Sequence, residues 1–157
     1  MRYLKTGLIE YNPNKTYSGA TLFSPLYHKV TYLIDLKGGM LHEWRLDGEL
    51  GAYAYLLPNG NLLAAIQTPD GPEGLHAKGG KIQEIDWDGN VVWEYHDDYQ
   101  HHDFQRLDNG NTIYLGWKLL PEKAAQRVQG GLPNTEHEDG IYGDYIREVD
   151  PAGKTVW

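Results

Sequence analysis

The chain has 157 residues, enough for one domain with its own core, and 40% of them are hydrophobic. Its formal net charge of -8 argues against a nucleic-acid partner, because binding to the phosphate backbone needs clustered lysine and arginine. Zero cysteines exclude disulfides, thiolate metal sites and cysteine nucleophiles. The N-terminus has no apolar signal segment and no stretch is long enough to span a membrane, so we expect a cytoplasmic protein without a membrane partner.

The chain consists mainly of short strand-like runs, rich in β-branched, aromatic and leucine residues, which tight turns join in pairs. Glycine and asparagine are frequent in these turns because both adopt positive φ at low cost. The turn sequences are KGG at 37–39, PNGN at 58–61, DGN at 88–90, DNGN at 108–111 and PAGK at 151–154. Apart from a short helical pattern around Pro121 to Gln129, no helical period is found, so the sequence predicts an all-β protein.

These pairs of strands repeat along the chain. Asp35 matches Asp86 at an offset of 51, and Gly60 matches Gly110 at an offset of 50. Repeats of this length, with about four strands in each unit, are typical of β-propeller blades. We therefore predict a β-propeller domain over residues 1–157 with three four-stranded blades, approximately 1–50, 51–100 and 101–157.

The third unit differs from the other two. Its Asp150 follows the equivalent aspartate of the second unit at an offset of 64, so the segment between Lys118 and Asp144 contains an insertion. Trp157 aligns with Trp93, which lies within a strand. A propeller closes with roughly 4 to 8 blades, and three blades leave free sheet edges. We expect part of a six-bladed ring, truncated at its C-terminus, that self-associates through open blade edges; a half-propeller that closes by dimerising is the alternative.

The order of these motifs covers nearly the whole chain: TYLIDLKGGMLHEWRL, AYLLPNGNLL, GGKIQEIDWDGNVVWEY, HHDFQRLDNGNTIYL and REVDPAGKTVW. It resembles the N-terminal half of the bacterial aryl sulfotransferase family, and the junction of HHDF with LDNGN is its most specific part. The resemblance implies transfer of a sulfuryl group from a phenolic ester to another phenol through a sulfated histidine in the propeller channel. It implies phenolic small-molecule substrates and no cofactor. Neutral imidazole suits this role, since it is nucleophilic near pH 7 without a separate base.

The resemblance also indicates candidate catalytic residues. Channel histidines of the family lie at the start of inner strands, and His102, with His101 and Asp103 beside it, is the one match in this sequence. We predict these three residues to be catalytic; solvated residues at the start of a strand are the structural alternative. In well-described members the nucleophile lies later in the chain, so His102 is expected to support catalysis and the 157 residues alone to show no turnover.

Two further residues are predicted to bind substrate. Because side chains alternate along a strand, His102, Phe104 and Arg106 are expected to share one face, where Arg106 would bind a sulfate ester bidentately. An outward salt bridge is the alternative for Arg106. His76, on a loop that would overhang the channel, is the second candidate, and a simple loop histidine is its alternative. No metal site is expected, since the run NTEHEDG around His137 matches no defined ligand spacing. A propeller that has lost catalysis and binds a small molecule or a protein remains the alternative function.

Overall fold

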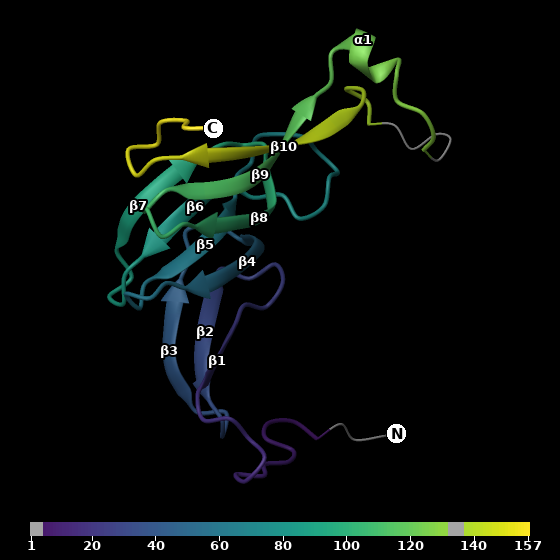
Figure 1. Ribbon diagram of the computed structural model, residues 1–157. Coiled ribbons are helices and arrows are strands. Elements are labelled where there is room, and N and C mark those ends of the chain that lie inside the picture. The colour runs from purple at the N-terminus through teal and green to yellow at the C-terminus, as the bar shows by residue number, and fades with distance from the viewer. Residues whose placement is uncertain (1–4, 132–136) are drawn as a thin grey trace.

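The computed structural model describes residues 5–131 and 137–157, in which the chain forms ten β-strands and one short helix. The strands belong to three antiparallel sheets that follow one another in chain order (Figure 1). The prediction of an all-β protein is therefore confirmed. In the described residues, no helix has the length and apolar character that crossing a membrane requires.

Each sheet is formed by one continuous segment of the chain. The first sheet has the order β1 (Ala20–Phe23), β2 (Val30–Asp35), β3 (Met40–Arg45). The middle sheet has the order β4 (Leu50–Leu56), β5 (Leu62–Gln67), β6 (Gly80–Ile85), β7 (Val91–His96). The last sheet has the order β10 (Tyr142–Val149), β9 (Thr112–Leu119), β8 (Gln100–Arg106). Four of the predicted hairpins, β2–β3, β4–β5, β6–β7 and β8–β9, are confirmed.

The same turn recurs in each unit. The Oδ1 atoms of Asp35, Asp86 and Asp150 each accept hydrogen bonds from the backbone N–H groups two and four residues later. Asn59 and Asn109 each accept one from the residue two positions on, both at 3.0 Å. A carboxylate or amide that ties down its own turn is an Asx turn, and it explains why these positions recur in the sequence.

Only the middle sheet has the four strands predicted for each unit. In the first sheet, residues 5–19 form turns, bends and irregular segments where a fourth strand was expected. In the last sheet, the residues after β10 contribute a single bridge, between Val149 and Thr155. None of the three sheets closes on itself within the described residues.

The core lies in two layers, one on each side of the middle sheet. Leu62, Ala64 and Ile66 of β5 pack with Leu33 and Trp44 of the first sheet. The alternate residues of β5 pack instead with the last sheet, in a cluster that contains Leu63, Ala65, Ile82, Phe104, Tyr114 and Val149. Burial on both faces explains why β5 is a continuous apolar run rather than an alternating one.

Indole groups join each sheet to the next one. Trp44 donates a 3.0 Å hydrogen bond to the carbonyl of Asp86, in the turn of the middle sheet. Trp93 likewise donates a 2.8 Å bond to the carbonyl of Pro151, in the turn of the last sheet. The two indoles occupy different positions in their units, since at the offset of 51 Trp44 corresponds to Tyr95 and Trp93 to His42. Each bond nevertheless joins a sheet to a turn of the sheet that follows it.

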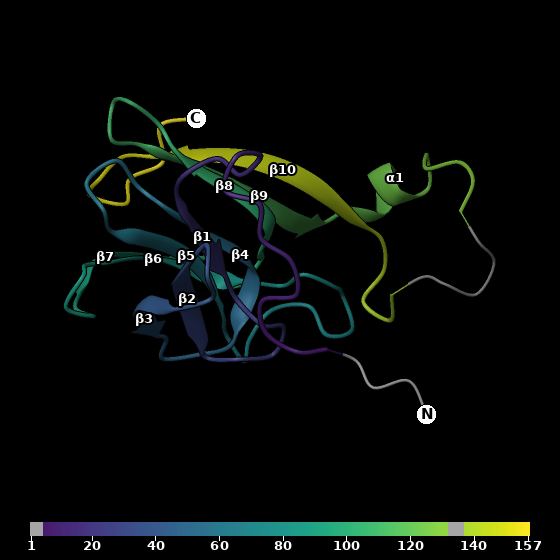
Figure 2. The ribbon, with the colours of Figure 1, turned by 90° about the horizontal axis from the view of Figure 1, so that it is seen from below.

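The insertion of the third unit lengthens one hairpin. β9 and β10 have eight residues each, where the equivalent β5 and β6 have six. The short helix α1 (Glu122–Ala125) follows β9, within the stretch predicted to be helical. The end of this hairpin and α1 project away from the sheets (Figures 1 and 2).

Candidate functional site

The predicted catalytic histidines lie in a bulge at the start of β8. His101 pairs with Leu115 and Phe104 with Tyr114, so His102 and Asp103 are two extra residues on β8. His102 adopts a φ of 48°, a left-handed conformation that is strained for a residue other than glycine. Such a bulge redirects side chains, and here it leaves His102 exposed while Phe104 is buried. The predicted alternation, with His102, Phe104 and Arg106 on one face, is wrong for this reason.

The equivalent strand of the middle sheet has a matching bulge. On β4, Leu50 pairs with Ile66 and Ala54 with Ala64, so two extra residues again interrupt the register. At the offset of 50, His102 corresponds to Ala52. The bulge is therefore a property of the repeat. The bulge on β8 differs from the one on β4 in having a histidine at this position.

A loop of the middle sheet holds this bulge in place. The backbone N–H of His102 donates a 3.0 Å hydrogen bond to the carbonyl of Ala77, and Lys78 forms an isolated bridge with His101. Ala77 itself has a φ of 56°. Two strained backbone positions thus meet at the histidines, a feature that is common at functional sites.

The two imidazole rings contact each other directly. Nδ1 of His101 lies 2.8 Å from Nδ1 of His102, so one ring donates a proton and the other accepts it. His101 is 3% exposed and stacks on Trp117, with the ring centroids 4.0 Å apart. Its Nε2 lies 3.3 Å from Oδ1 of Asp144, without the alignment of a hydrogen bond.

These contacts determine where the protons lie. Burial lowers the pKa of His101, and the carboxylate of Asp144 opposes this only in part, so His101 is neutral near pH 7. The negative charge of Asp144 favours a proton on Nε2 of His101, which leaves its Nδ1 as the acceptor. With Nδ1 of His101 as the acceptor, the matching tautomer of a neutral His102 donates its Nδ1–H and has its lone pair on Nε2. Since His102 is exposed, that lone pair is accessible to a substrate.

Asp103 is held by a neighbouring strand rather than by the histidines. Its Oδ1 accepts a 2.7 Å hydrogen bond from the hydroxyl of Tyr53 on β4 and a 2.8 Å bond from the N–H of Phe104. Burial and the adjacent carboxylate raise the pKa of Tyr53, so this hydroxyl stays protonated. Asp103 therefore fixes the position of the bulge against β4.

Arg106 lies at the boundary between the middle and last sheets. Its guanidinium donates hydrogen bonds to Glu84, at 3.1 Å, and to the carbonyl of Gly110, at 3.0 Å, and lies 4.2 Å from the centroid of the Trp93 ring. Burial lowers the pKa of Arg106, and the charge of Glu84 opposes that shift. Arg106 pairs with Thr112, three residues along β9 from Leu115, the partner of His101, so Arg106 lies about 10 Å along the sheet from the histidines.

His76 lines a groove next to the histidine pair. The groove has a volume of about 670 Å³ and lies between the loop that follows β5 and the start of β4, with Tyr27 and Lys78 also in its walls. His76 is exposed, and the backbone of the next residue, Ala77, contacts His102. The structure therefore brings the loop of His76 to the histidines, while its side chain faces the groove.

Two residues of this site were not found from the sequence. Asp144 and Trp117 are partners in the β9–β10 register, and both contact His101. They also line a pocket of about 270 Å³ with Leu75 and Tyr142. The repeat gives no indication of Asp144, because the equivalent residue of the middle sheet is Gly80.

The described residues contain no group of three or more carboxylates and histidines placed to hold a metal ion. His137 instead donates a 2.7 Å hydrogen bond to the carbonyl of Glu73. Residues 134–136 of the NTEHEDG run lie outside the described residues.

No protein-family model matches the chain, and no curated protein matches it. The chain is similar to a crystal structure of a protein of unknown function from Bacteroides caccae, with a TM-score of 0.52 and 17% sequence identity. The match covers 88% of this chain and 44% of that chain, so this chain spans less than half of that protein. At this identity the similarity concerns the fold alone.

Proposed function

We propose that the three sheets are blades of a β-propeller and that the chain belongs to an aryl-sulfotransferase-like protein. It transfers a sulfuryl group from a phenolic sulfate ester to a phenol. The observation that carries the proposal is the 2.8 Å contact between Nδ1 of buried His101 and Nδ1 of exposed His102. With His101 as the acceptor, Nε2 of His102 is free to attack. The repeated units and the order of motifs support the propeller.

His102 is proposed as the nucleophile itself rather than as a supporting residue. Its Nε2 lone pair attacks the sulfur of the ester, and the bond from sulfur to the phenolic oxygen breaks as the N–S bond forms. The phenolate leaves and takes a proton from water. In the second step, an acceptor phenol that has lost its proton attacks sulfur, the N–S bond breaks, and neutral His102 is restored.

His101 stabilises the intermediate. Once Nε2 of His102 carries a sulfuryl group, its ring becomes cationic, and the 2.8 Å hydrogen bond to His101 becomes charge-assisted. A neutral His101 can accept the hydrogen bond from the cationic ring of His102, whereas a protonated His101 would repel that ring. The lowered pKa of His101 therefore suits the proposed role.

The surroundings offer places for both parts of the substrate. The pocket that contains Trp117 and Tyr142 offers two aromatic side chains against which an aromatic ring can pack, and Trp117 stacks on His101. Lys78, which bridges to His101 through the backbone, supplies a positive charge on the neighbouring segment. Arg106 is assigned to the contact between sheets, since Glu84 already neutralises its charge.

A non-catalytic binding module is the second candidate. The groove of about 670 Å³ that His76 lines favours it, because a groove of this size accommodates a small molecule without any chemistry at His102. In that case an aryl sulfate would bind unchanged.

Release of 4-nitrophenolate from 4-nitrophenyl sulfate separates the two candidates. We expect one equivalent of phenolate for each chain, without further turnover, and no release by His102→Ala. His96→Ala is the matched control, since His96 is an exposed histidine on β7 that pairs with Asp98. Binding of the ester without release by the wild-type protein would favour the binding module and contradict the proposed enzyme.

A further inference from the structure

The middle and last sheets are built in the same register. The cross-strand pairs of β5 and β6 recur, at the offsets of 50 and 64, as pairs of β9 and β10: Leu63↔Glu84 and Ala65↔Ile82 correspond to Ile113↔Glu148 and Leu115↔Ile146. Residues with the same position in the two sheets therefore face in the same direction. The apolar residues of this face are Leu63, Ala65 and Ile82 in the middle sheet, and Ile113, Leu115 and Ile146 in the last sheet.

The same face has opposite exposure in the two sheets. In the middle sheet Leu63, Ala65 and Ile82 are all 0% exposed, because the last sheet covers them. In the last sheet Ile146 is 53% exposed, and its neighbours line an open depression of about 190 Å³. The last sheet thus has apolar residues at the same positions of this face as the middle sheet, but no described residue covers them.

The first sheet has the complementary open face. Ile34 of β2 corresponds to Ile85 of β6 and Val149 of β10, which are 2% and 0% exposed because the preceding sheet packs on them. The first sheet has no preceding sheet among the described residues. On its open face, Phe23 is 43% exposed and contacts Tyr32, with ring centroids 5.4 Å apart.

We propose that two copies of this chain associate head to tail, with the first sheet of one copy stacked on the open face of the last sheet of the other. The contact would continue the stacking already present between the first and middle sheets and between the middle and last sheets. Both faces carry the apolar residues that this stacking buries elsewhere in the chain. A heterologous contact of this kind forms a closed ring if the rotation between the copies allows it. The proposal does not depend on sulfuryl transfer.

Two single substitutions test the two faces separately. Ile146→Lys places a charge on the open face of the last sheet, and Phe23→Lys places one on the open face of the first sheet. Both side chains are exposed in the isolated chain, so neither substitution should prevent folding, which far-UV circular dichroism verifies. Val92→Lys is the matched control, since Val92 is 54% exposed on β7, outside both faces.

The measurement is sedimentation equilibrium at concentrations on the order of 10 μM, which populate a dimer of micromolar Kd. We expect a dimer for the wild-type protein and for Val92→Lys, and a dissociation constant raised at least about tenfold for each of the other variants. An equimolar mixture of Ile146→Lys and Phe23→Lys should recover a heterodimer, because each variant retains the face that the other lacks.

A monomeric wild-type protein would overturn the proposal. So would a dimer that withstands both substitutions, as association through sheet edges would produce. Loss of association with one substitution alone would indicate an isologous contact and would also contradict the head-to-tail arrangement.

Discussion

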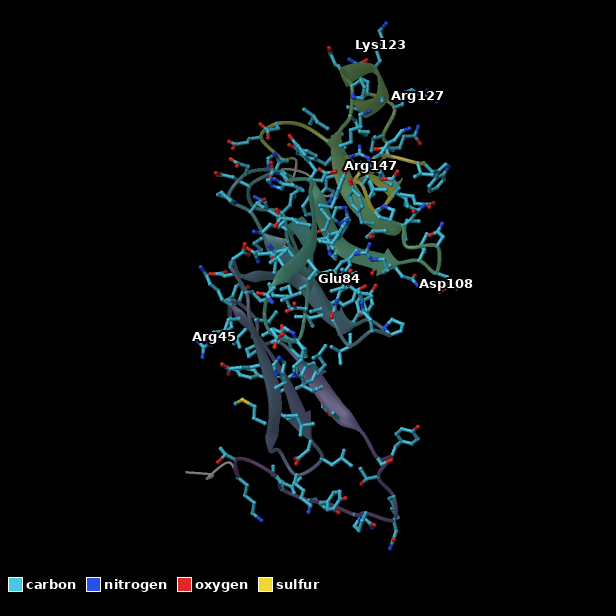
Figure 3. All side chains as sticks on the ribbon, turned by 90° about the vertical axis from the view of Figure 1, so that its left-hand side faces the viewer. Arg45, Glu84, Asp108, Lys123, Arg127 and Arg147 are labelled. Atoms are coloured by element: carbon cyan, nitrogen blue, oxygen red, sulfur yellow. The ribbon has the colours of Figure 1, made fainter. Side chains whose placement is uncertain are left out.

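Arg106 of the last sheet donates a 3.1 Å hydrogen bond to Glu84 of the middle sheet, and the two side chains are only 13% and 14% exposed. Asn59 and Asn61 also donate to Glu84, at 3.1 and 2.7 Å. Glu84 lies near the middle of the molecule in Figure 3. This ion pair joins two sheets at the far end of β8 from the histidines, so it holds the strand that positions His102.

Replacement of Arg106 by methionine should destabilise the protein. The substitution leaves a largely buried carboxylate without its cation, and we expect the free energy of unfolding to fall by about 3 kcal/mol. Urea unfolding followed by circular dichroism measures the change. The double variant Arg106→Met/Glu84→Gln should lose less than the sum of the two single variants, because both remove the same pair.

Arg45→Met is the matched control for that variant. Arg45 pairs with Glu43, but its side chain is 83% exposed and extends away from the sheets in Figure 3. An exposed pair of this kind stabilises a protein by at most about 1 kcal/mol. Equal losses of stability for Arg45→Met and Arg106→Met would contradict the assigned role of Arg106.

Gly116→Ala should also be destabilising. Gly116 of β9 lies opposite Tyr145 of β10, and a β-carbon at this position would overlap the tyrosine ring. The ring has little freedom to move away, because its hydroxyl donates a hydrogen bond to Asp97. We expect a loss of about 2 kcal/mol in urea unfolding, as for other overpacked sites. Gly19→Ala, with no atom within 4 Å of the added carbon, should change stability little, and a similar loss there would refute the argument.

His101 should make the protein sensitive to mild acid. Burial lowers the pKa of His101 in the folded state, so below about pH 6.5 the unfolded chain binds the proton more readily than the folded one. The stabilising contribution is present above that pH and is lost as the pH falls. The free energy of unfolding should decrease between about pH 6.5 and 5, and His101→Gln should reduce this decrease. The exposed His96, replaced by glutamine, serves as the control; an unchanged pH dependence in His101→Gln would contradict the prediction.

Local turn chemistry made much of the fold predictable. Asp35, Asp86 and Asp150 each tie down their own turn, so the repeat is visible in the sequence at the positions where the backbone requires those residues. The hairpins follow from the turns. The number of strands in each sheet was less predictable, since pairing of the segments before β1 and after β10 depends on neighbours distant in the sequence.

The arrangement of the site could not be read from the sequence for two reasons. Strand periodicity predicted that the side chains of Phe104 and His102 lie on the same face of β8. The two extra residues in the bulge make these side chains point in different directions. The contact of His101 with Asp144 depends on the pairing of β9 with β10 across the long insertion. The histidines themselves were identified as candidates, whereas their carboxylate and aromatic neighbours required the three-dimensional arrangement.

The most direct test is to locate a sulfuryl group on the protein. The wild-type chain is incubated with 4-nitrophenyl sulfate, quenched at alkaline pH, which protects an N-sulfuryl imidazole, and mapped by peptide mass spectrometry. We predict one sulfuryl group on His102 and none in His102→Ala. A wild-type chain without an adduct, or one with the group on another residue that His102→Ala also carries, would contradict the assignment of His102 as the nucleophile.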